Sequence, residues 1–200
     1  MVRGSRESAG TDDAARMELA NRVFFRLYQC ANMLHKTGTR AVEAEGLTTQ
    51  QWAVLGALSR DRAREGMSIG ALARYLMVSR QNLSGVIGRM ERDGHVAVLP
   101  DPRDRRSRVV TMTGSGRHVW RVLAQPKIRA YYRAVLADFS INDSARVLHD
   151  LLKILENMKR VDAAQAGGGG DEPSRGGVPT DGGGRARRAD GAAARGRAGR

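Results

Sequence analysis

Apolar positions recur at helical spacing over residues 14–43, a stretch without proline. Val23, Leu27, Leu34 and the pair at 30–31 lie three or four residues apart, which predicts one long helix with an apolar stripe. At about 1.5 Å per residue this helix is about 45 Å long. A helix of that length is expected to pack against a partner.

A second helix is predicted over residues 48–60, where Thr48 or Thr49 can cap the N-terminus. Its inward-facing residues are Trp52, Leu55 and Leu58. Two further helices are predicted over 115–138, with a kink or break at Pro126, and over 142–161. The last of these helices carries a double apolar stripe made of Val147, Leu148, Leu151, Leu152, Ile154, Leu155 and Met158. So wide a stripe favours contact with a second copy of the chain over packing within the chain.

The centre of the chain predicts a helix-turn-helix. Ser68 precedes a helix of about two turns, and Ser79 is placed to cap a second helix that ends at Gly94. Apolar residues of the second helix recur at i, i+3, i+4 and i+7 from Leu83, which leaves the opposite face polar. This face and its cap hold the candidate DNA-binding residues Ser79, Arg80, Gln81, Asn82, Ser84 and Arg89. Arginine pairs with guanine, and glutamine or asparagine with adenine, in the major groove.

A hairpin is predicted directly after this motif, with strands over 96–99 and 108–112. The turn between them is rich in charge, and its candidate DNA-binding residues are Arg103, Asp104, Arg105 and Arg106. An arginine at the tip of such a wing can enter the minor groove, and Asp104 can hold a neighbouring arginine side chain. A solvated charged turn is the alternative for the hairpin taken alone.

Residues 48–117, which hold these elements, resemble the MarR family of winged-helix transcriptional regulators. The flanking helices match the family in order and length, so the resemblance covers about residues 14–161. The residues that carry the resemblance are Leu72-Ala73, Val78-Ser79, Leu83, the run Met90 to Val96, the wing Asp101 to Ser107, and Met112 to Gly116. The resemblance implies a mainly α fold with a small β wing. In that fold a winged helix over about 48–113 is flanked by dimerisation helices over about 14–43 and 115–161.

The resemblance also implies roles for single residues. Arg106 would be the minor-groove arginine, Asp104 its orienting partner, and the segment from Ser79 to Gly85 the major-groove end of the recognition helix. Relatives often carry a larger polar residue where this chain has Gly85, so a base contact there is not expected. The resemblance further implies a homodimer whose two recognition helices read half-sites one turn, about 10 bp, apart.

Members of the family commonly release DNA when a small aromatic acid, a related thioester or an oxidant arrives. The candidate ligand-binding residues for an aromatic acid are Phe24, Tyr28, His35, Arg40 and Trp52. Packing in the core is the alternative for the aromatic ones. Cys30 lies on the apolar stripe of the first helix, so burial is expected for it rather than oxidant sensing.

The composition of the chain indicates an anionic partner. The formal net charge is +13 and the isoelectric point is about 11.1, which favours binding to nucleic acid or to an acidic surface. Half of the 24 glycines lie in the last 36 residues. A disordered Gly/Arg-rich tail is therefore predicted over 162–200, and a loose arm over 1–13.

Other classes of protein find little support in the sequence. One cysteine excludes an internal disulfide and fits a reducing, cytoplasmic compartment. The chain has no apolar run long enough for a bilayer, no catalytic motif and no clustered histidines. No enzyme activity, cofactor or metal is expected.

The sequence therefore predicts a homodimeric, sequence-specific regulator of transcription. Its expected role is that of a repressor, released from a palindromic operator by a small aromatic effector. Two alternatives remain open: a nonspecific architectural nucleic-acid-binding protein, and an oxidant-sensing repressor that acts through Cys30.

Overall fold

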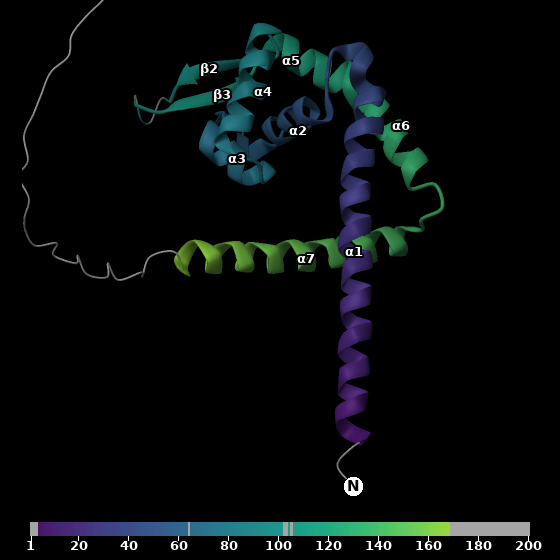
Figure 1. Cartoon of the computed structure of the whole chain (residues 1–200). Coiled ribbons are helices and arrows are strands. Elements are labelled where there is room, and N and C mark those ends of the chain that lie inside the picture. The colour runs from purple at the N-terminus through teal and green to yellow at the C-terminus, as the bar shows by residue number, and fades with distance from the viewer. Residues whose placement is uncertain (1–3, 64, 102–103, 105, 169–200) are drawn as a thin grey trace, which may run out of the picture. The chain divides into compact units, whose positions relative to one another are not determined.

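The computed structural model describes the backbone of residues 4–63, 65–101, 104 and 106–168, and the side chains of this set from 12 to 166 (Figure 1). The chain forms two compact units, Met1–Ser140 and Ile141–Arg200. The first unit holds six α-helices, three short 3₁₀ or π segments and a three-stranded sheet within its described residues. This mainly α fold with a small β wing is the one that the sequence predicts.

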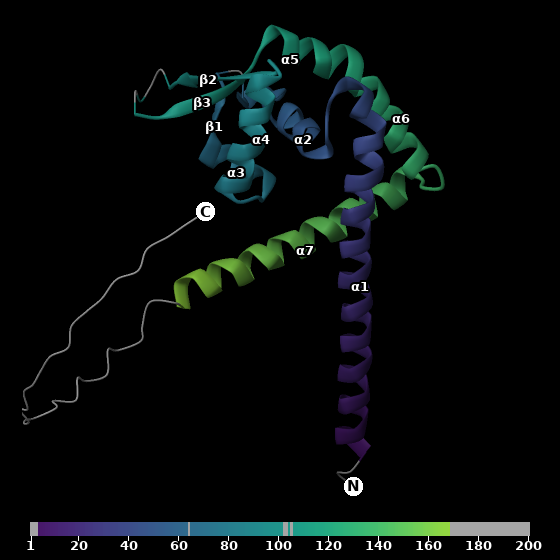
Figure 2. The same ribbon diagram turned by 45° about the horizontal axis from the view of Figure 1, so that its top comes forward.

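The first helix, α1 (Gly4–Val42), has 39 residues. It begins well before residue 14, so the structure places residues 4–13 in a helix and not in the expected loose arm. This segment has no proline and several good helix formers, which let the helix propagate through it. Figures 1 and 2 show the N-terminal half of α1 extending away from the rest of its unit. Only the C-terminal end of α1 joins the core, where Val42 is fully buried.

After the short 3₁₀ turn η1 (Glu43–Glu45), α2 (Thr49–Leu58) begins at a capping box. The Gln51 backbone N–H donates to Thr48 Oγ1 (3.3 Å), and the Thr48 backbone N–H donates to Gln51 Oε1 (2.8 Å). Thr48, of the two candidates, is therefore the N-cap. The inward face of α2 is confirmed, because Trp52, Leu55 and Leu58 are buried.

Replacing Thr48 with alanine is expected to lower the free energy of unfolding by about 1 kcal/mol, since it leaves a helix N–H without an acceptor. Urea unfolding at fixed protein concentration measures this change. Thr48→Ser keeps the hydroxyl and is expected to stay close to the wild type. Equal urea midpoints for Thr48→Ala and the wild type would show that the box contributes nothing.

The helix-turn-helix follows the 3₁₀ turn η2 (Asp61–Ala63) and a two-residue strand, β1 (Met67–Ser68). Ser68 caps α3 (Ile69–Leu76), and Ser79 caps α4 (Arg80–Arg92). Between the helices Met77 adopts a left-handed conformation with φ +55°. Gly94, also left-handed at φ +74°, ends α4 as the sequence predicts.

The wing is an antiparallel hairpin of β2 (Val96–Pro100) and β3 (Arg108–Met112), in which Val98 pairs with Val110. β1 adds to the far side of β3, so the sheet order is β1-β3-β2. The sequence analysis missed β1, because two residues are too short to show an alternating pattern.

The predicted helix 115–138 is divided into α5 (Gly114–His118), the π-helical segment η3 (Val119–Ala124) and α6 (Gln125–Val135). Pro126 lies in the first turn of α6. Its missing N–H cannot continue the α-helical ladder, which accounts for the change of helix type immediately before it. Lys127 of α6 forms an ion pair with Glu45 of η1.

The second unit is described over α7 (Ile141–Gly168). The helix passes residue 161, so residues 162–168 belong to it and not to the predicted tail. The Ala and Gln residues over 163–166 favour helix, which explains the extension. The tail expected over 169–200 lies outside the described residues. Within the described part of the chain, no helix is sufficiently long and apolar to cross a bilayer.

Candidate nucleic-acid interface and adjoining cavity

The N-terminal end of α4 presents a continuous exposed polar surface. Its exposed members are Ser79, Arg80, Gln81, Asn82, Ser84 and Arg89, all of them sequence-predicted. The first turn of α4 contains no acidic residue. Glu91, further along, turns toward the sheet and accepts a hydrogen bond from the Val98 backbone N–H (3.1 Å). Positive charge and amide groups therefore dominate the accessible face of this helix.

Local contacts fix part of this surface. Ser79 Oγ accepts from the Asn82 backbone N–H (3.2 Å), and Ser84 Oγ donates to the Arg80 carbonyl (2.8 Å). The Arg80 guanidinium packs against Gly70 at the start of α3, where a Cβ would lie 2.4 Å from Arg80 Nη2. Arg80 is therefore positioned across the two helices of the motif before any ligand arrives.

Two glycines leave the outer face of α4 open. A Cβ on Gly88 would meet nothing within 4 Å, and one on Gly85 would meet only Arg89 Nη1, at 3.8 Å. The absence of side chains here permits close approach of another molecule's backbone.

At the wing tip, Asp104 organises the turn through the main chain. The Arg106 backbone N–H donates to Asp104 Oδ1 (3.0 Å), and the Ser107 N–H donates to the Asp104 carbonyl (2.8 Å). The expected role of Asp104 was to hold an arginine side chain; the contact that the structure gives it with Arg106 is to the backbone. Arg106 is exposed. Arg103 and Arg105 lie outside the described residues.

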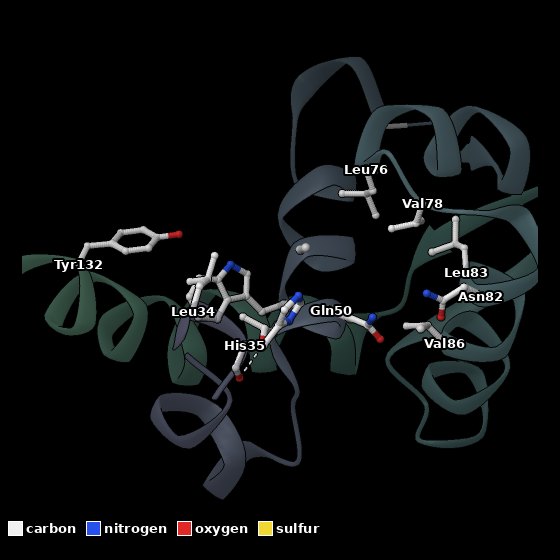
Figure 3. A pocket seen from close by; sticks show the side chains of 12 residues that line it. Leu34, His35, Gln50, Leu76, Val78, Asn82, Leu83, Val86 and Tyr132 are labelled. Atoms are coloured by element: carbon white, nitrogen blue, oxygen red, sulfur yellow. Dashed lines mark hydrogen bonds between the residues drawn. The ribbon is translucent and has the colours of Figure 1, made fainter. Parts of the chain in front are cut away.

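A cavity of about 390 Å³ lies behind α4, bounded by α1, α2, the α3–α4 turn, α4 and α6 (Figure 3). His35 and Trp52, both predicted as ligand-binding residues, line it. Phe24, Tyr28 and Arg40 are exposed on α1 and are not among its lining residues. The walls are mostly apolar and include Leu34, Ala53, Leu76, Val78, Leu83 and Val86.

The sequence analysis missed the other polar groups of this cavity. Gln50 of α2, Asn82 of α4 and Tyr132 of α6 join it from three elements (Figure 3). Asn82 lies on the face that the sequence predicts to bind DNA, and only the folded arrangement shows that the cavity reaches this residue. It is therefore shared between the cavity and the polar surface of α4.

Aromatic contacts shape one end of the cavity. The Trp52 ring centroid lies 6.1 Å from that of Tyr131 and 5.8 Å from that of Tyr132, both edge-on. The Tyr131 hydroxyl is 2.9 Å from Thr37 Oγ1 on α1. Partial burial raises the pKa of the Tyr132 phenol above its ordinary value of 10.0, so it stays protonated and can donate a hydrogen bond at neutral pH.

Large apolar faces of both units are left uncovered. On α1 the exposed residues are Met17, Leu19, Val23, Phe24, Phe25, Tyr28, Met33 and Leu34. On α7 they are Ile141, Val147, Leu148, Leu151, Leu152, Leu155, Met158 and Val161. Cys30 is also exposed, so the expectation of burial is wrong for the single chain. Among the described residues, the apolar stripe that predicted its burial is exposed at Val23 and Leu34.

The described residues contain no group of three or more His, Cys, Asp or Glu side chains that could hold a metal ion.

Comparison with known proteins agrees with this architecture. Residues 45–107 match the model of the MarR family. The chain is 77% identical over 165 residues to the "Transcriptional activatory protein BadR" of Rhodopseudomonas palustris, covering 82% of this chain and 94% of that protein. It is 31% identical to the "Homoprotocatechuate degradative operon repressor" of Escherichia coli, covering 54% of this chain and 70% of the relative.

The solved structure of the Mycobacterium tuberculosis transcriptional regulator MosR in complex with DNA is 26% identical to this chain. It covers 68% of this chain and 96% of its own, with a TM-score of 0.59. The helix-turn-helix, the wing that follows it and these matches lead to one conclusion: the chain belongs to the MarR family of transcriptional regulators.

Proposed function

We propose that two copies of this chain bind one DNA duplex, each placing the N-terminal end of α4 in the major groove and its wing at the minor groove. The observation that carries the proposal is the exposed N-terminal surface of α4, where Arg80, Gln81 and Asn82 project from the first turn and no carboxylate lies in that turn. The similarity to a regulator solved on DNA supports the same arrangement.

Selection of duplexes from a random pool, followed by fluorescence anisotropy, tests this proposal. We expect a palindromic site with half-sites about 10 bp apart. Its affinity at physiological salt should exceed that for random duplex by a factor on the order of 10³ or more. A ratio near one would instead support the architectural alternative, in which the charge of +13 acts without sequence preference.

Arg106→Ala is expected to weaken operator binding by about 1–3 kcal/mol, or about 5- to 150-fold in Kd, because the minor groove loses a cation. Arg133→Ala, which removes the same charge from exposed α6, is the matched control. Anisotropy titrations at several salt concentrations measure both. Unchanged affinity and salt slope in Arg106→Ala would remove this residue from the interface.

We further propose that the cavity behind α4 binds a small aromatic acid that alters DNA affinity. Its volume of about 390 Å³ falls in the range of small-molecule sites. Trp52 and Tyr132 offer ring contacts, and His35, Gln50 and Asn82 offer polar groups to a carboxylate. Because Asn82 lies at both the cavity and the DNA-facing surface, an acid bound to it would compete with base contact. A ligand that binds the DNA-free form more tightly would then shift the equilibrium away from DNA.

A thermal-shift screen of aromatic carboxylates tests this proposal. An acid present at 100 times its Kd is expected to raise the free energy of unfolding by about 2.7 kcal/mol. The uncharged amide of the same acid should stabilise less, and Gln50→Leu should reduce the shift. Equal stabilisation by acid and amide would contradict recognition of the carboxylate.

The direction of regulation is proposed from the relatives. The sequence analysis expected a repressor, and a relative at 31% identity carries that name. The relative at 77% identity is named an activatory protein. We therefore propose activation first and repression as the second candidate. Transcription in vitro from a promoter that holds the selected site separates them, by a rise or a fall in transcript when the protein is added.

The exposure of Cys30 keeps the oxidant-sensing alternative open. Peroxide treatment of the wild type and of Cys30→Ser tests it directly. Release of DNA by the wild type alone would assign sensing to this thiol. Equal behaviour of the two proteins would leave the aromatic-acid proposal in place.

A further inference from the structure

A second cavity lies in the winged-helix unit, apart from the one proposed for the effector. It has a volume of about 440 Å³ and lies between the end of α2, η2, β3, α5 and η3. Its walls include Arg60, Asp61, Arg117, Trp120 and Arg121. The two cavities have no lining residue in common.

Positive charge surrounds this second cavity. Three arginines, Arg60, Arg117 and Arg121, line it beside a single carboxylate, Asp61, which has a partner of its own. Arg117 Nη1 donates to the Met112 carbonyl (2.6 Å). The Arg60 guanidinium stacks 5.3 Å from the centre of the Tyr75 ring. The guanidinium groups of Arg60 and Arg117 are thus held in place and keep further N–H donors for a ligand. Because they are already ordered, they lose less conformational entropy when they bind an anion.

Trp120 gives the cavity an apolar wall. The residue is 7% exposed, and its ring edge packs against Gly56 of α2, where a Cβ would lie 3.4 Å from Cη2. Its Nε1–H is itself buried, without a hydrogen-bond partner among the described residues. At the cavity, Trp120 therefore offers its ring for apolar contact.

The backbone at this wall is unusual as well. Trp120 and Arg121 belong to the π-helical segment η3, and the Gln125 N–H donates to the Trp120 carbonyl across its wider turn. Pro126 explains why the helix changes type here. The wider turn places an aromatic ring and a guanidinium next to each other on one cavity, and π turns of this kind occur frequently at functional sites.

From these four features we propose that the second cavity binds a small organic anion, a carboxylate or a phosphate ester, whose apolar part packs against Trp120. The three arginines bind the charged group, beside the ring of Trp120. This proposal concerns a site that is independent of the effector cavity and of DNA binding.

The two tryptophans of the chain allow a direct test, because Trp52 lines the first cavity and Trp120 the second. The full chain, labelled with ¹⁵N-tryptophan, gives two indole N–H resonances, which Trp120→Phe assigns. The probes are 3-phenylpropionate, 3-phenylpropyl phosphate and, as the uncharged match, 3-phenylpropionamide. We expect a saturable shift of the Trp120 indole resonance with at least one of the anions and none with the amide. The anion that binds more tightly distinguishes a carboxylate from a phosphate ligand.

Arg121→Gln is expected to weaken the binding of that anion at least tenfold, whereas Arg129→Gln, an exposed arginine of α6 outside both cavities, is expected to leave it unchanged. Both substitutions are at exposed positions, so the folded chain can be compared directly. The proposal is overturned if neither anion moves the Trp120 resonance, if the amide binds equally well, or if Arg121→Gln binds like the wild type. A response confined to Trp52 would also overturn it while supporting the effector cavity.

Discussion

Gly116→Ala is expected to lower the free energy of unfolding by about 3 kcal/mol or more, the upper end of the cost of inserting one methyl group into a packed site. A Cβ at this position would lie 1.9 Å from the His95 carbonyl oxygen and 2.8 Å from its carbon. Both atoms belong to the backbone, which cannot rotate aside. Met112 Cγ, at 3.1 Å from the same Cβ, adds a weaker conflict with a side chain that can shift. Gly116 is helical, so the helix propensity of alanine would otherwise favour the substitution.

The contact is tight because three segments meet there. The Thr113 backbone N–H donates to the His95 carbonyl (3.1 Å), and Thr113 Oγ1 donates to the Gly94 carbonyl (2.6 Å). The same Thr113 hydroxyl accepts from the Gly116 N–H (2.9 Å) and caps α5. The end of α4, the start of β2 and the start of α5 are therefore joined through one threonine, with Gly116 against it.

Gly114→Ala is the matched control. It lies two residues away in the same helix, and a Cβ on Gly114 would meet nothing within 4 Å. Urea unfolding of both variants is expected to show no loss of stability for Gly114→Ala and a large loss for Gly116→Ala. Equal urea midpoints for the two variants would show that the backbone at His95 can move aside. The contact between α4, β2 and α5 through Thr113 would then not be rigid.

Local signals in the sequence predict most of the winged helix. Ser79 and Gly94 bound α4, and the repeat of Leu83, Val86, Ile87 and Met90 sets its buried face. The two main strands are predicted from short apolar runs on either side of a segment rich in turn residues. These features depend on neighbours in sequence, so periodicity and capping chemistry are sufficient to find them. The same signals found the polar surface of α4 and the charged wing.

What the sequence analysis missed depends on contacts between distant residues. The approach of Arg80 to Gly70 arises when α3 packs against α4, and the place of Asn82 in a cavity wall arises when α1, α2 and α6 pack behind α4. Periodicity identifies the apolar stripe around Cys30, but it does not tell whether the surface that covers this stripe belongs to the same chain. Within the part of the single chain that the structure describes, Cys30 is exposed.

The uncovered stripe on α7 leads to the second large prediction. We expect Leu148→Glu combined with Leu152→Glu to convert the protein to a monomer in solution. Both side chains are more than half exposed in the chain itself, at 58% and 55%, so the fold of the single chain does not need them. A dimer that buries them would instead have to desolvate two carboxylates on each copy. Sedimentation velocity measures the change in mass.

The same double variant is expected to lose about 10²- to 10⁴-fold in affinity for a two-half-site duplex, since a second recognition helix no longer binds at high effective concentration. Its affinity for a duplex with one half-site should change little, because α4 and the wing are untouched. His149→Glu, which adds a carboxylate at an exposed polar position of the same helix, is expected to stay dimeric and to bind normally. A double variant that remains dimeric would place the subunit contact elsewhere, and the uncovered face of α1 would be the next surface to test. A monomer that still binds the full site tightly would contradict paired recognition itself, and with it the proposed geometry of two helices in successive grooves.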